Sequence, residues 1–153
     1  MQEVNVLKLS IELVPSSCWG SNLKAKLKQS DWDKIRKAAY AKEDMHCHIC
    51  GDECTRLNAH ETWEFNEETH TQKLIDIIAV CGPCHNTIHF GRSINIGYAE
   101  EAKEQYLKVN DCDESVLERE LEQAKLDFLR RSKINDWKLD VSFVESQGYF
   151  LKE

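Results

Sequence analysis

Two CxxC pairs constrain this chain more than any other feature: Cys47 and Cys50 form one, and Cys81 and Cys84 form the other. The chain has seven cysteines, an odd number, and its first ten residues lack the basic segment and apolar stretch of a secretory leader. We therefore expect a cytoplasmic protein, in which paired cysteines are more often metal ligands than disulfides. The four thiols predict a structural Zn²⁺ in tetrahedral coordination.

The remaining cysteines give one alternative ligand. Cys54 could replace Cys50, although its larger separation from Cys47 in the sequence makes a poorer metal-binding knuckle. Cys18 and Cys112 stand alone in the sequence, and we expect them to be ordinary thiols.

The chain between the two pairs has the length of one β-hairpin. Residues 56–65 and 71–80 have the composition of strands, and the residues between them are typical of a hairpin connection. A helix is expected from Pro83 to about residue 90, because proline is favoured in the first helical turn. Gly51 allows the tight chain reversal after the first cysteine pair. The segment therefore predicts a ββα unit built around the zinc.

Histidines form a second group of possible ligands. His85 and His89 are four residues apart on the expected helix, so their side chains share one face. His60 lies on the first strand of the hairpin, which a ββα unit brings against that helix. Three imidazoles, with Glu61 nearby, would hold a second divalent cation and leave coordination positions open for water and phosphate.

Flanking segments predict helices and two terminal strands. Residues 5–15 and 137–144 alternate apolar and polar side chains, and we expect strands near 6–13 and 137–143 to pair antiparallel. Helices are expected at 22–27, from an N-cap at Ser30 to about 43, and in two stretches within 98–131.

Composition excludes several classes of protein. The 153 residues are 41% hydrophobic and 31% charged, which is typical of a globular chain, and the apolar run at 77–81 is far shorter than the ~20 residues of a membrane span. The net charge of −7 argues against a protein that coats nucleic acid by bulk electrostatics. One basic stretch is a candidate for binding the phosphates of DNA, or else the solvated face of two short helices. Its basic residues are Lys24, Lys26, Lys28, Lys34, Arg36 and Lys37.

Three segments carry the motifs described above: CHICG at 47–51, LNAHE at 57–61 and IAVCGPCHNTIH at 78–89. Together they resemble the zinc-bearing branch of the HNH endonuclease superfamily. The runs HETWEF and CGPCHNTIHFGRS, preceded by WGSNL and SDWDKIRKAAY, resemble small HNH-type proteins of bacteria and phages. The resemblance implies an α+β fold: a treble-clef ββα-metal module at 45–92 within a single domain of residues 1–153, with a helical extension at 98–131 and terminal strands.

The resemblance also implies roles for individual residues. His60, His85 and His89 take the positions of the ligands of a catalytic cation, which could be Mg²⁺, Mn²⁺, Ni²⁺ or Zn²⁺. Glu61 takes the position of the general base, where the family usually has His. The implied catalytic set is therefore Glu61 with His60 and His85.

A second departure from the family lies at Asp76, which occupies the position of the usual Asn. A shifted alignment with His60 as the base would put Ala59, which cannot bind a metal, at the ligand position, so His60 is preferred as the ligand. If Glu61 is not the base, His60 or His70 becomes the alternative.

Two functions follow as expectations. The first is an HNH-type metal-dependent endonuclease that hydrolyses the phosphodiester bonds of DNA. The second is a catalytically degenerate HNH-fold zinc protein that acts as an acidic, phage-type regulator or inhibitor and binds a protein partner. A basic rim around the histidines would favour the nuclease, and an acidic rim would favour the regulator.

Overall fold

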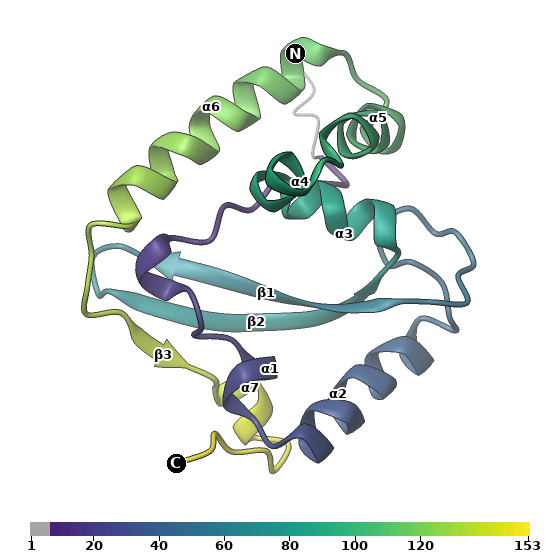
Figure 1. Cartoon of the computed structure of the whole chain (residues 1–153). Helices are drawn as coiled ribbons and strands as arrows, with labels where there is room; N and C mark the ends of the chain where they lie inside the picture. The colour runs from purple at the N-terminus through teal and green to yellow at the C-terminus, as the bar shows by residue number, and fades with distance from the viewer. Residues whose placement is uncertain (1–6) are drawn as a thin grey trace, which may run out of the picture.

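The computed structural model describes residues 7–153, and its central element is a long β-hairpin (Figure 1). Helices α3, α4, α5 and α6 cover one side of the hairpin, whereas α1, α2 and α7 lie on the other side. The fold is a small mixed α+β arrangement, as the sequence predicts. The elements in chain order are η1 (Ser16–Cys18), α1 (Leu23–Lys26), α2 (Gln29–Lys42), β1 (Asn58–Asn66), β2 (Thr71–Val80), α3 (Gly82–Ile88), α4 (Phe90–Ile96), α5 (Ala99–Asn110), α6 (Glu114–Arg131), β3 (Lys138–Asp140) and α7 (Ser142–Glu145).

The sheet has three strands in the order β1-β2-β3. Strands β1 and β2 pair antiparallel, with Asn58 opposite Val80 at one end and a tight turn after Asn66 at the other. This pairing confirms the predicted hairpin to within two residues. The register shifts between Thr62 and Trp63, and such an irregularity bends a strand locally.

The predicted N-terminal strand is wrong for the residues that the structure describes. Residues 7–15 have no strand geometry. Instead, Leu9 exchanges two hydrogen bonds with the side chain of Asn110 (2.9 and 2.8 Å), and the N–H of Ile11 donates to Glu120 (2.7 Å). Because side chains of α5 and α6 hydrogen-bond to the backbone of this segment, it needs no strand partner. Its alternating apolar side chains pack against helices. Residues 5 and 6 lie outside the described part.

The predicted C-terminal strand is shorter than expected and has a different partner. Strand β3 covers three residues and runs parallel to β2 at residues 71–73, so the antiparallel pairing of the two chain ends is also wrong. Asp140 accepts the N–H of Ser142 (3.0 Å), where α7 begins. Val141 and Val144 are both buried, and residues three apart share a face in a helix but not in a strand. The burial of both side chains therefore favours a helix after β3.

The helices follow the predictions with two differences. Helix α2 begins at Gln29, so Ser30 lies in its first turn and is not the N-cap. The helix expected at residues 83–90 breaks at His89, whose ψ of 53° separates α3 from α4. Within residues 7–153, no helix is long and apolar enough to cross a membrane.

Buried side chains form three clusters that hold the layers together. One lies between the sheet and α1, α2 and α7. A second surrounds the paired cysteines at the start of α3, and a third joins the N-terminal segment to α4, α5 and α6. The end of the hairpin that carries α3 is therefore packed from both sides.

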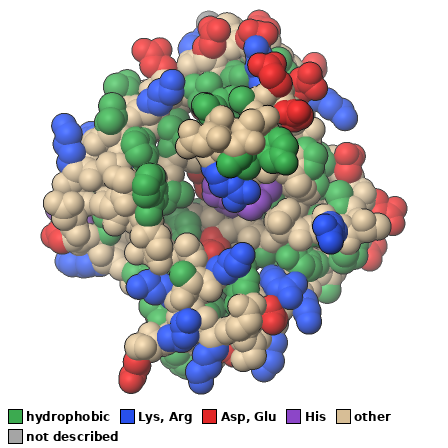
Figure 2. All heavy atoms as spheres, in the orientation of Figure 1, with side chains coloured by type: hydrophobic (Ala, Val, Ile, Leu, Met, Phe, Trp, Pro, Cys, Tyr) green, Lys and Arg blue, Asp and Glu red, His purple; other side chains and the backbone are tan. Residues whose placement is uncertain are grey.

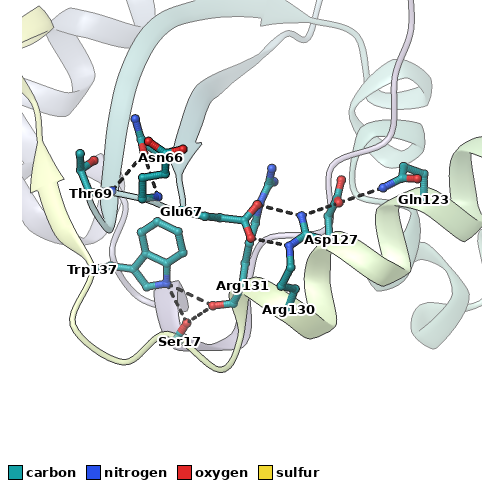
Figure 3. A network of polar contacts seen from close by, with 10 residues as sticks. Ser17, Asn66, Glu67, Thr69, Gln123, Asp127, Arg130, Arg131 and Trp137 are labelled. Carbon is teal, nitrogen blue, oxygen red and sulfur yellow. Dashed lines mark hydrogen bonds and ion pairs between the residues drawn. The ribbon is translucent and has the colours of Figure 1, made fainter.

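The opposite end of the hairpin is fixed by a polar network (Figure 3). Glu67, in the turn after β1, accepts hydrogen bonds from Arg130 (2.8 Å) and Arg131 (3.2 Å) at the end of α6. The indole N–H of Trp137 donates to the hydroxyl of Ser17 (3.0 Å). These contacts join the hairpin turn, α6 and the chain before β3 far from the cysteines.

Candidate metal centres

The two CxxC pairs meet at the end of β2. The Sγ atoms of Cys47, Cys50, Cys81 and Cys84 all lie within 4.8 Å of one another, and those of Cys50 and Cys81 are 3.7 Å apart. Four sulfurs at this separation can bind one metal ion, as the sequence predicts. Cys54 is not part of the cluster; its thiol donates to the carbonyl of Asp52 (3.5 Å).

Backbone amides hold the sulfurs in place. The N–H of Cys50 points to Cys47 Sγ (3.5 Å), and the N–H of Cys84 points to Cys81 Sγ (3.4 Å), where Cys81 is the N-cap of α3. Gly51 has a φ of +80°, the left-handed conformation that the tight turn after Cys50 requires. The N–H of His48 donates to Ala79 in β2 (2.8 Å), which docks the first pair against the second.

The thiols share their protons unequally. Hydrogen bonds from Cys81 and Cys84 lower the pKa of Cys47, and the same bonds raise the pKa values of Cys81 and Cys84. A bound divalent cation would stabilise all four sulfurs as thiolates. The side chain of Gln105 in α5 adds a further donor to Cys84 Sγ (3.3 Å).

The three histidines also come together. His60 is on β1, His85 is in α3, and His89 ends that helix; one ring nitrogen of each lies within 4.8 Å of the others. The ring centroids of His85 and His89 are 4.7 Å apart. His60 is buried, with 3% of its surface exposed. These distances allow the three imidazoles to bind one cation.

The electrostatic setting keeps two of the imidazoles neutral. Burial, with the charge of neighbouring groups, lowers the pKa of His85 to about 3 and that of His89 to about 4. Neutral imidazole has a free lone pair at pH 7, the form that binds metals.

Glu12 is a site residue that the sequence analysis missed. Its Oε2 lies 3.0 Å from Nε2 of His60, although Glu12 precedes the ββα unit by more than 40 residues in the sequence. No periodicity or motif marks this residue, because its position depends on how residues 7–15 pack against α3, α5 and α6. Only the fold brings it to the histidines.

The histidines line a cavity of about 630 Å³. Figure 2 shows them at the bottom of a central hollow. Lys and Arg side chains gather below the hollow over α1 and α2, whereas Asp and Glu gather at the top of this face over α5 and α6. The charged residues of the lining are Glu12, Lys24, Asp33, Arg36, Glu61 and Arg92.

Of the six predicted phosphate-binding residues, two line the cavity. Lys24 is exposed at its edge, and Arg36 is paired with Asp33 (2.9 Å). The other four, Lys26, Lys28, Lys34 and Lys37, are exposed on α1, α2 and the turn between them. Arg92, on α4, is a further basic residue of the lining that the sequence analysis missed, although it follows the HxxxH motif by one helical turn.

Glu61 lines the same cavity as the histidines. Its Oε1 accepts the N–H of Leu23 at the start of α1 (2.6 Å), and burial raises its pKa. Asp76 lies opposite Thr62 in the hairpin and accepts the N–H of the next residue, Ile77 (2.8 Å). His70 lies in the hairpin turn, paired with Asp136 (2.6 Å), so it is at the far end of the sheet from the histidine cluster.

Comparison with models of protein families, with curated proteins and with solved structures gives no match to this chain.

Proposed function

We propose that this chain is a metal-dependent phosphodiesterase of the HNH type that cuts DNA. In this proposal the ββα unit is a treble clef with Zn²⁺ on the four cysteines, and the three histidines bind a catalytic divalent cation. The observation that carries the proposal is a cluster of three imidazoles, one buried and two half-buried, in a cavity that three basic side chains also line, Lys24, Arg36 and Arg92.

Each group in the cavity has a chemical task. The cation, when bound, would polarise the scissile phosphate and stabilise the charge on the leaving oxygen. Glu61 takes a proton from the attacking water, and the hydrogen bond from Leu23 fixes its carboxylate at the cavity wall. Lys24 and Arg92 bind the neighbouring phosphates of the DNA backbone.

The alternative is an acidic regulator that keeps the fold without the chemistry. The acidic side chains over α5 and α6 and the net charge of −7 support it, because DNA would be repelled from that part of the surface (Figure 2). Such a protein would bind its partner without a reactive cation.

A plasmid-cleavage assay with Mg²⁺, Mn²⁺, Ni²⁺ and Zn²⁺ separates the two. We expect the protein to nick DNA with at least one of these ions and His89→Ala to abolish the cleavage while the four-cysteine site stays loaded. His70→Ala is the matched control, because His70 lies at the other end of the hairpin, and it should cut like the parent protein. Absence of cleavage with all four ions would favour the regulator.

A further inference from the structure

Glu12 and His60 are close together in a way that ordinary hydrogen bonding does not explain. Glu12 Oε2 and His60 Nε2 are 3.0 Å apart. Yet among the described residues no group makes a hydrogen bond of acceptable geometry with this nitrogen, which is fully buried. A buried polar atom without a hydrogen-bond partner is costly, and binding to a cation would account for its position.

The distance fits two donors that share one cation. A first-row divalent ion binds imidazole nitrogen and carboxylate oxygen at about 2.0–2.2 Å, so two neighbouring donors on the same ion lie about 3.0–3.5 Å apart. A carboxylate and an imidazole at this separation, both directed at an ion, need not hydrogen-bond to each other.

The position of Glu12 is set without help from a ligand. Its backbone N–H donates to the carbonyl of Ile88 at the end of α3 (2.8 Å), and the N–H of Ile11 donates to Glu120 in α6 (2.7 Å). Helix α3 also supplies His85, and His89 follows Ile88. The carboxylate is therefore held beside the same turn that presents two of the imidazoles.

We propose that Glu12 is a fourth protein ligand of the cation at the histidine cluster, which becomes a three-histidine, one-carboxylate site. This proposal rests on the metal centre of the proposed function but not on nuclease activity. Three imidazole donors favour a first-row transition ion such as Zn²⁺, Ni²⁺ or Mn²⁺ over Mg²⁺, which prefers oxygen ligands and keeps several waters. The Glu12 carboxylate leaves fewer positions for water and phosphate.

The test is Co²⁺ binding to protein whose four-cysteine site already holds Zn²⁺, followed by the visible absorption of Co²⁺ and by calorimetry, without DNA. We expect Glu12→Gln to weaken Co²⁺ binding by at least about 10-fold, since losing even an outer partner of a ligand costs this much. The spectrum should also change, because the number of ligands falls. Asp33→Asn is the matched control: it removes a carboxylate of the same cavity that pairs with Arg36, and it should bind Co²⁺ like the parent protein.

Each outcome decides the proposal. If Glu12→Gln keeps both the affinity and the spectrum, or loses affinity with an unchanged spectrum, Glu12 is not a ligand and only positions His60. If Glu12→Gln lacks the far-UV CD of the parent protein, Glu12→Asp takes its place, because it draws the carboxylate back by one methylene, and the same two criteria apply. A parent protein that binds no Co²⁺ beyond the cysteine site would overturn the metal centre itself.

Discussion

The cysteine cluster and the histidine cluster are built from the same short helix but have opposite surroundings. Helix α3 begins with Cys81 as its N-cap and ends at His89. The sulfurs lie within a buried apolar cluster and receive hydrogen bonds from backbone amides and from Gln105. The imidazoles line a cavity that also holds acidic and basic side chains.

Under the proposed function, one helix serves stability at one end and reactivity at the other. Four cysteine sulfurs fill the tetrahedral coordination of a zinc ion and leave no position for a substrate, so a metal there would serve the fold. A site with neutral imidazoles on a cavity wall leaves room for water and phosphate. Four predictions test this division, beginning with the largest effect.

The cysteine cluster should control folding. Cys81→Ser removes a thiolate that also caps α3, and we expect loss of the bound metal and of most far-UV CD, because structural zinc contributes on the order of 10 kcal/mol to folding. Removal of metal by a strong chelator should act in the same way. Cys54→Ser is the control, since Cys54 lies outside the cluster and should keep both metal and fold. Metal-free protein with unchanged CD would contradict a structural role.

The cavity lined by the histidines should control the rate of DNA cleavage but not folding. Glu61→Gln can still accept the N–H of Leu23 but cannot take a proton, so we expect cleavage to slow by roughly 10²-fold or more with unchanged CD and unchanged cation binding. Glu61→His, which introduces the base usual in the HNH family, should retain or raise activity. A Glu61→Gln variant that cuts as fast as the parent protein would show that another group accepts the proton.

A smaller effect is expected where α5 supports the cysteine cluster. Gln105→Leu removes the side-chain donor to Cys84 Sγ, and we expect the metal to be lost to a competing chelator at about 10-fold lower chelator concentration. Gln123→Leu on α6 is the control, because within residues 7–153 the side chain of Gln123 donates to Asp127 and to no cysteine. Equal retention of metal in the two variants would mean that the backbone amides alone support the sulfurs.

The smallest effect should come from the hairpin turn, which lies far from both clusters. Arg130 and Arg131 lower the pKa of Glu67 to about 2 from its ordinary value of 4.5. The ion pairs therefore stabilise the fold fully above about pH 4.5 and lose this effect as the pH falls toward 2. Urea unfolding should give a slightly lower free energy of unfolding for Glu67→Gln than for the parent protein at pH 7, and this difference should decrease as the pH is lowered.

Two controls complete the test at the hairpin turn. Glu68→Gln, at the exposed neighbouring position, should unfold in urea like the parent protein at pH 7. Metal content and Co²⁺ binding of Glu67→Gln should equal those of the parent protein. A Glu67→Gln variant that loses either metal would mean that the two ends of the hairpin are coupled.

The local features of both clusters could be predicted from the sequence. The two extended segments at 56–65 and 71–80 and the connection between them predict the hairpin, and the four-residue spacing of His85 and His89 puts them near each other. The spacing did not reveal that the chain leaves the helix at His89, because this break depends on packing of α4 against α5.

Long-range contacts could not be predicted in this way. Alternation in residues 7–15 and 137–144 indicates one buried face but does not say whether that face lies against a strand or a helix. Side chains such as Asn110 and Glu120 decide the matter by bonding to the backbone of the N-terminal segment, and nothing in their local sequence marks them for that role. The position of Glu12 beside His60 could not be predicted for the same reason.

The docking of the N-terminal segment also has a consequence for the order of folding. Its hydrogen bonds span 101 residues from Leu9 to Asn110 and 109 residues from Ile11 to Glu120. Closing a chain loop of that length costs more entropy than pairing the two strands of a hairpin, so contacts of this range form late. On the ribosome, the cysteine cluster and the hairpin can assemble once residue 89 has emerged. The bonds that hold Leu9 and Ile11, next to Glu12, cannot form until α5 and α6 have been synthesised. The cavity is therefore completed later than the cysteine cluster, although α3 contributes to both.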